Sequence, residues 1–175
     1  MALALLTAGF SSGCRGWQGD MYLRHRAPAK RARQEATYQF GLPGDRWRPV
    51  RKVEDVQVAW LDPGRSAVIE VHAQCDDQGD SSLQQYTDHL RMDMTEWKVV
   101  DQREEQLLGR AALRTVVDAE LDGVPLRHEF VVLKKNGCLF DLSYSAAPSS
   151  FAAGQPDFHR VVAGFRFPVS EAGGG

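Results

Sequence analysis

Residues 110–134, RAALRTVVDAELDGVPLRHEFVVLK, predict a long β-hairpin. Polar and apolar side chains alternate through much of this stretch, and Asp122-Gly123 near its middle is a favoured two-residue hairpin turn. That turn sets Asp118 opposite Arg127, where opposite charges attract across the two strands. The other expected pairs are Ala119 with Leu126, Val117 with His128, Thr115 with Phe130, and Leu113 with Val132. The pattern therefore predicts both the hairpin and its register.

A further strand follows the hairpin, and its register depends on the length of the connection. A two-residue connection, Asn136-Gly137, sets Val132 opposite Asp141. A three-residue connection, residues 135–137, gives the pairs Val132 with Phe140, Phe130 with Leu142, and His128 with Tyr144. We expect the three-residue connection, because it pairs apolar side chains and leaves Gly137 left-handed in a bulge.

The remaining periodicity predicts an α+β fold. Alternating side chains indicate earlier strands in residues 37–42, 56–60 and 67–75 and a later strand over residues 97–107. Ser81 is expected to cap a helix that runs to residue 94, and Pro156 is expected in the first turn of a last helix. The apolar side of the first of these helices consists of Leu83, Tyr86, Leu90 and Met94. Val131, Leu133 and Leu139 make the second face of the sheet apolar too. We therefore predict a single domain with a mostly antiparallel sheet and helices packed on both faces.

Length and charge exclude several classes of protein. The 175 residues suit one domain, and 16 Gly and 8 Pro are too few for a collagen-like chain. Residues 1–52 contain ten Lys and Arg but three Asp and Glu, whereas residues 53–175 contain eleven and twenty. A basic N-terminal segment attached to an acidic domain is typical of a tether. It argues against a domain that binds nucleic acid.

The first residues resemble a bacterial lipoprotein signal. Residues 2–10 are apolar except for Thr7, and Ser11-Ser12-Gly13-Cys14 follows at once. The resemblance implies removal of residues 1–13 as a signal peptide and lipidation of Cys14, which becomes the mature N-terminus. Residues 14–36 then form a lipidated, basic tether, either solvated or in contact with anionic lipid. Arg15 follows the cysteine in place of Asp, which favours the outer membrane, with the domain facing the periplasm.

The body of the chain, residues 37–168, resembles the PsbP-like (DcrB-like) superfamily. The resemblance rests on Tyr38 and Phe40, on Pro43 before Trp47, on a helix after the third strand and on the long meander. The closing residues that add to it are Phe151, Pro156, Phe158, Val161, Val162, Phe165, Arg166 and Phe167. It implies an antiparallel sheet between helical layers and an accessory or binding role. Residues 169–175 are expected to be a flexible tail.

Cys75 and Cys138 are candidates for a disulfide. With Cys14 lipidated, these two cysteines remain, and both fall at strand ends on apolar-facing positions. An exported protein occupies a compartment that permits disulfides. The alternative is two separate buried thiols.

No residue pattern specifies a reaction, a metal or a cofactor. His72 and Cys75 lie three apart on one strand, so they point to opposite faces, and His72 shares its face with Glu70 and Gln74. Asp76, Asp77 and Asp80 do not have the spacing of a calcium loop, and His128 is expected to be a core histidine. There is no G-x-S-x-G motif, phosphate loop or dinucleotide fingerprint. An enzyme would have to use Glu70, His72 and Arg114.

We therefore expect a non-catalytic, lipid-anchored envelope protein that binds another envelope protein. Trp47, Trp60 and Trp97 are expected to pack in the core or to line the partner surface. The alternative is a periplasmic small-molecule binder, with a pocket between sheet and helix lined by residues such as Trp60 and Tyr144. We expect no cofactor and no nucleic acid.

Overall fold

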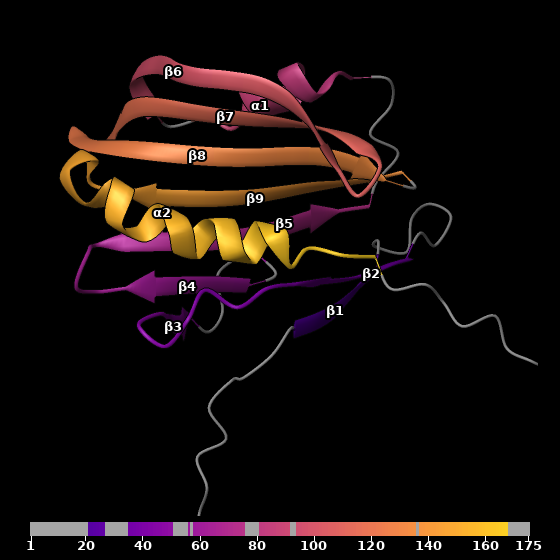
Figure 1. Ribbon diagram of the computed structural model, residues 1–175. Coiled ribbons are helices and arrows are strands. Elements are labelled where there is room, and N and C mark those ends of the chain that lie inside the picture. Colours follow the sequence, from indigo (N-terminus) through magenta and orange to yellow (C-terminus); the bar gives the residue numbers. More distant parts are fainter. Residues whose placement is uncertain are drawn as a thin grey trace, which may run out of the picture.

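In the computed structural model, a seven-stranded antiparallel sheet carries two helices (Figure 1). The described residues are 21–26, 35–50, 56, 58–75, 81–91, 94–135 and 137–167. The strand order is β3-β4-β5-β9-β8-β7-β6, and β1 and β2 form a separate two-stranded ribbon. The elements are β1 Met21–Arg26, β2 Glu35–Phe40, β3 Arg48–Val50, β4 Val58–Asp62, β5 Ala67–Gln74, α1 Leu83–His89, β6 Met94–Leu107, β7 Arg110–Leu121, β8 Val124–Lys135, β9 Cys138–Ala146 and α2 Pro148–Ala163. The predicted α+β class and the mostly antiparallel sheet are confirmed.

The β7–β8 hairpin has the predicted register. Ala119 lies opposite Leu126, and Leu113 lies opposite Val132. Asp118 lies opposite Arg127, and its carboxylate accepts two hydrogen bonds from the guanidinium, at 2.6 and 2.8 Å. The local turn chemistry was sufficient to predict this pairing because no long-range choice was involved.

The expected three-residue connection between β8 and β9 is wrong. Lys135 lies opposite Cys138, so the connection has two residues, and Val132 lies opposite Asp141 rather than Phe140. Phe130 accordingly lies opposite Ser143, and His128 opposite Ser145. A shift of one residue moves every side chain of β9 to the other face. The set of alternating β9 residues that includes Phe140, Leu142 and Tyr144 is apolar and therefore lies on the face that packs against α2.

Consecutive residues of β8 belong to two different apolar clusters. Val131 and Leu133 pack in a cluster with α2 residues, whereas Phe130 and Val132 pack in a cluster with α1 residues. Since successive side chains of a strand point to opposite faces, we call these the α2 face and the α1 face of the sheet. Figure 1 shows α2 across the front of β5, β8 and β9, with α1 behind β7.

The α2 face holds the main core. Its fully buried side chains include Tyr38, Phe40, Ile69, Phe140, Leu142, Tyr144, Phe158 and Phe165. Helix α2 starts at Pro148, earlier than expected, because a proline at the first helical position has a suitable φ and needs no partner for its missing N–H. Pro156, which was expected in the first turn, therefore lies inside the helix.

A close backbone contact fixes the end of α2. A Cβ added to Gly164 would meet the backbone nitrogen of Gly41 at 2.3 Å, and one added to Gly41 would meet the carbonyl oxygen of Arg160 at 2.3 Å. The Gly41 N–H donates to the Val161 carbonyl at 3.1 Å. Beyond this contact, Gln39 and Arg166 form an isolated bridge. Two glycines are needed because any side chain would separate the two backbones.

The helix on the α1 face is shorter than expected and begins one residue later. Its N-cap is Ser82 rather than Ser81: the Ser82 hydroxyl accepts from the Gln85 N–H at 3.2 Å, and the Gln85 side chain accepts from the Ser82 N–H at 2.8 Å. This capping box defines the start. The helix ends at His89, and Met94 is already part of β6. Leu83, Tyr86 and Leu90 face the sheet as the periodicity indicated.

Strand β1, residues 21–26, lies within the segment that we expected to be a tether and pairs with β2. The N-terminal residues 1–20 are outside the described residues, and so are Cys14, the segment 76–80 with its three aspartates, and residues 168–175. No helix in the described part of the chain is long and apolar enough to cross a membrane.

Candidate functional site

A cavity of about 600 Å³ opens on the α1 face, beside α1 and over strands β5 and β9. Helix α1 packs mainly against β7 and β8. An α-helix with its side chains is about 10–12 Å wide and strands are about 4.8 Å apart, so one short helix covers two or three strands. The cavity is lined by Val56, Glu70, His72, Gln74, Ser81, Tyr86, His89, Leu90, Leu139 and Asp141.

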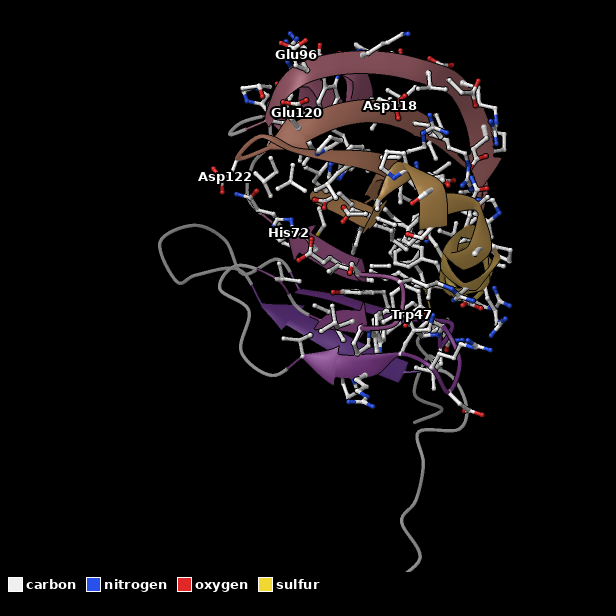
Figure 2. The ribbon with its side chains drawn as sticks, turned by 90° about the vertical axis from the view of Figure 1, so that its left-hand side faces the viewer. Trp47, His72, Glu96, Asp118, Glu120 and Asp122 are labelled. Atoms are coloured by element: carbon white, nitrogen blue, oxygen red, sulfur yellow. A yellow bond between two sulfur atoms is a disulfide. The ribbon has the colours of Figure 1, made fainter. Side chains whose placement is uncertain are left out.

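The floor of the cavity is a row of polar side chains on paired strands. His72 of β5 lies opposite Asp141 of β9, and its Nδ1 donates to Asp141 Oδ2 at 2.8 Å. Glu70 lies opposite Ser143, whose hydroxyl donates to the Glu70 carboxylate at 3.5 Å. Figure 2 shows His72 on the side of β5 away from α2. Strand pairing therefore places an imidazole and two carboxylates side by side.

The environment of Glu70 makes its negative charge costly. Burial raises the pKa of the Glu70 carboxyl above its usual range, and the charge of Asp141 raises it further. The Ser143 hydroxyl and the His72 imidazole act in the opposite direction and are weaker influences. A perturbed carboxyl in a concave site is a common property of binding and catalytic sites. The arrangement can accept protons or hydrogen bonds from a bound group.

Of the three residues proposed for an enzyme, the structure brings two together. Glu70 and His72 line the cavity, but Arg114 lies on the α2 face, where its guanidinium binds Glu105 with two hydrogen bonds of 3.0 Å and also contacts Glu129. Glu129 is 1% exposed and also accepts from Gln155 and His159 of α2, at 2.8 and 2.9 Å. Arg114 therefore belongs to a buried ionic cluster under α2.

The residues named for a ligand pocket do not form one. Trp60 and Tyr144 are 3% and 0% exposed and pack in the α2-face core, where Trp60 meets Phe40 and Tyr144 meets Phe151 and Phe158. The predicted packing of Trp47 in the core is confirmed. Trp97 stacks on Phe130 of the α1 face.

His128 is a buried core histidine, as expected, but its neighbours differ from those predicted. The corrected β9 register removes Tyr144 from its side, and Nδ1 instead forms a hydrogen bond of 2.7 Å with the Ser145 hydroxyl. The ring stacks on Phe130 at a centroid distance of 5.7 Å. Nε2 is buried without a partner among the described residues, and burial lowers the His128 pKa to about 4.

Asp141 is the site residue that the sequence reasoning missed. In the three-residue connection, Asp141 lay on the other face of the sheet, away from Val132 and His128. A usable signal was present in Asn136-Gly137, because Asn-Gly is among the strongest two-residue hairpin signals. Applying it would have set Asp141 on the face of Val132, the face that carries this cavity.

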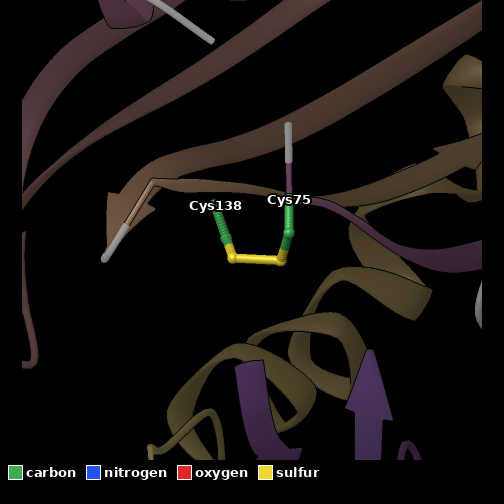
Figure 3. Close-up of a disulfide and its surroundings, with 2 residues drawn as sticks. All are labelled: Cys75 and Cys138. Carbon is green, nitrogen blue, oxygen red and sulfur yellow. A yellow bond between two sulfur atoms is a disulfide. The ribbon is translucent and has the colours of Figure 1, made fainter. Parts of the chain in front are cut away.

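A disulfide joins Cys75 and Cys138 at one end of the cavity (Figure 3). Cys75 follows Gln74, and Cys138 precedes Leu139, and both of these neighbours line the cavity. The cysteine side chains themselves belong to the α2-face core. The bond therefore links the end of β5 to the start of β9, the two strands that carry the polar row.

Among the described residues, no group of three or more His, Cys, Asp or Glu side chains is arranged to hold a metal ion. The described part of the chain therefore offers no candidate metal centre.

Solved structures with a similar fold include two with a TM-score of 0.56. One is cyanobacterial PsbP (CyanoP) of Synechocystis sp. PCC 6803, with a TM-score of 0.56 and 14% identity, covering 90% of this chain and 98% of that one. The other is LpqN of Mycobacterium tuberculosis, involved in cell envelope biogenesis, with a TM-score of 0.56 and 14% identity, covering 86% and 91%. No protein-family model and no curated sequence matches the chain. At this identity the likeness supports a PsbP-like fold and carries no function.

Proposed function

We propose that this protein is a non-catalytic envelope protein that binds a small molecule in the cavity beside α1. The observation that carries the proposal is the cavity itself: about 600 Å³, with apolar walls and a polar row of Glu70, His72 and Asp141 on its floor. Ligand sites have this size and this combination of apolar lining and few convergent polar groups. The scaffold is an α+β sheet with helices packed on both faces.

We further propose that the chain is held to the cell envelope through a lipid on Cys14 and faces the periplasm. The apolar segment 2–10, the small residues before Cys14 and the Cys75–Cys138 disulfide support an extracytoplasmic site, and so does the fold likeness to LpqN. Arg15 after the cysteine favours the outer membrane. Anchoring would raise the effective concentration near an envelope partner.

The anchor is tested by metabolic labelling with a palmitate analogue, followed by membrane fractionation. Wild type is expected to carry the label and to sediment with membranes, and Cys14→Ser is expected to lose both. An unlabelled, soluble wild-type protein that keeps residues 1–13 contradicts the proposed location.

The binding function is tested by a fragment screen read out by NMR on the folded protein. Ligands are expected to shift the signals of Glu70, His72 and Leu139. Gln74→Trp fills the cavity and should abolish these shifts, whereas Ala152→Trp, on the exposed side of α2, should leave them unchanged. Absence of any fragment that distinguishes these two variants contradicts the proposal.

A second candidate function, binding of another envelope protein, is favoured by strand β6. Among the described strands it is one of the two edges of the seven-stranded sheet, the other being β3; it is 14 residues long and carries exposed Val99 and Val100. An exposed edge can pair with a strand of a partner. A photo-crosslinking residue at Val100 is expected to capture one envelope protein reproducibly, and the same residue at Ala152 is not. Equal capture from both positions contradicts strand addition at β6.

A further inference from the structure

The proposed function does not specify the chemical class of the ligand. The charges around the cavity restrict that class. We propose that the cavity binds a small primary amine, with the ammonium group at Glu70 and Asp141 and an apolar substituent along α1. This inference rests on the proposed function and adds the class of ligand.

The charges that face the cavity favour a cation. Glu70 and Asp141 supply two carboxylates from neighbouring strands, and the described residues that line the cavity include no lysine or arginine. Lys134 of β8 contacts two of the lining residues: its ammonium donates to the Ser81 carbonyl and lies 4.6 Å from the Tyr86 ring centre. Lys134 is thus held at the border of the cavity, and the floor keeps an excess of acceptors.

The His72 imidazole leaves the negative charge of the two carboxylates incompletely compensated. His72 donates to Asp141 at 2.8 Å, while Glu70 receives a long hydrogen bond of 3.5 Å from Ser143. Burial and the Asp141 charge raise the pKa of Glu70. A cation between the two carboxylates removes this repulsion and supplies the hydrogen-bond donors that a half-buried carboxylate needs.

The walls of the cavity select an apolar substituent on the amine. Leu139 is buried on the floor, and Leu90 and Tyr86 are half-buried along α1. Val56 contributes a further apolar side chain. These groups lie around the polar row, so an aryl or alkyl group attached to the ammonium would remove apolar surface from water. A polyamine lacks such a group and fits this lining less well.

Binding of the amine would be linked to protons. At pH values between the ordinary pKa of a glutamate and the raised pKa of Glu70, part of the free protein carries a protonated Glu70. A bound ammonium group favours the ionised form of this carboxyl. Binding is therefore expected to release a proton in mildly acidic buffer. The other titratable groups at the cavity are His72 and Asp141 on the sheet, Tyr86 and His89 on α1, and Lys134 at the border.

The experiment is isothermal titration calorimetry of the full chain with benzylamine, benzyl alcohol and benzoate. These compounds share a phenyl ring and differ in the charge of their polar group. Benzylamine is expected to bind, and Glu70→Gln or Asp141→Asn should each weaken it about tenfold or more. Glu104→Gln removes an exposed carboxylate from β6 and should leave the affinity unchanged. Repeating the titration at mildly acidic pH in buffers of different ionisation enthalpy should show proton release, which Glu70→Gln abolishes.

The outcomes separate the two proposals. If benzyl alcohol or benzoate binds the cavity as tightly as benzylamine, or if Glu104→Gln weakens benzylamine as much as Glu70→Gln, the amine assignment is overturned and the binding function stands. If no compound in this set or in the fragment screen binds the cavity, the binding function itself is overturned. Either floor variant suffices, so a folding defect in one leaves the test intact.

Discussion

The α2 face and the α1 face of the same sheet are covered very differently. Helix α2 has 16 residues, about 24 Å of helix, and α1 has seven, about 10 Å. The longer helix lies against β5, β8 and β9, and the side chains under it form the main core. The shorter helix lies against β7 and β8, and the polar side chains of β5 and β9 remain accessible beside it. The length of the covering helix therefore decides which face has room for a ligand.

The largest effect is expected from breaking the buried ionic cluster of the α2 face. Glu129→Ala leaves Arg114 with Glu105 alone and removes the acceptor of Gln155 and His159. Removing one partner of a buried ion pair costs roughly 3–5 kcal/mol. Urea unfolding should show this loss, and Glu104→Ala, at an exposed carboxylate, should change the unfolding free energy by less than about 0.5 kcal/mol. Equal losses would contradict the burial argument.

A nearly equal loss of unfolding free energy is expected from His128 on the α1 face when the pH is lowered. His128 has a pKa of about 4 in the folded protein, against an ordinary value of 6.5, so the unfolded chain takes up the proton first. The unfolding free energy therefore does not depend on this histidine's protonation above about pH 6.5. It falls by about 3 kcal/mol as the pH is lowered from 6.5 to 4. His128→Phe should flatten the pH dependence of the unfolding free energy over this range.

The control for His128 is His159→Gln, at a half-exposed histidine of α2. That variant should keep the steep loss of stability between pH 6.5 and 4. If it flattens the curve as much as His128→Phe does, the buried neutral imidazole is not the cause.

Two buried tyrosines of the α2 face differ in the hydrogen bonding of their hydroxyl groups. The Tyr144 hydroxyl donates to the Phe151 carbonyl at 2.9 Å, whereas the Tyr38 hydroxyl is buried without a partner among the described residues. Tyr144→Phe should lower the unfolding free energy by about 1–2 kcal/mol. Tyr38→Phe should leave it unchanged or raise it, because no hydrogen bond is lost. A larger loss for Tyr38→Phe in thermal unfolding would show that its hydroxyl has a partner.

The smallest effect is expected at the start of α1. Ser82→Ala removes the cap and should cost about 1 kcal/mol, while Ser81→Ala should cost almost nothing. Hydrogen exchange of the α1 amides is the direct measurement, since a seven-residue helix depends strongly on its cap. Faster exchange in Ser81→Ala than in Ser82→Ala would reverse the assignment of the cap.

Local signals predicted the parts of the fold that depend on neighbouring residues. The Asp122-Gly123 turn predicted the β7–β8 register, and the apolar stripe of Leu83, Tyr86 and Leu90 predicted the inward side of α1. The candidate site was predicted in part. Glu70 and His72 were correctly set on one side of β5, but the expected β8–β9 connection set Asp141 on the wrong face.

Contacts within a few residues were enough to predict the alternation of each strand, the β7–β8 turn and the apolar side of α1. Tertiary packing settles the choice between the two β8–β9 connections, and with it which set of alternating β9 side chains faces α2. Both sets of alternating β9 residues include apolar side chains. Which set faces α2 therefore depends on packing Phe140, Leu142 and Tyr144 against the aromatic side chains of β2 and α2. That packing leaves Asp141 opposite His72 and so creates the polar floor of the cavity.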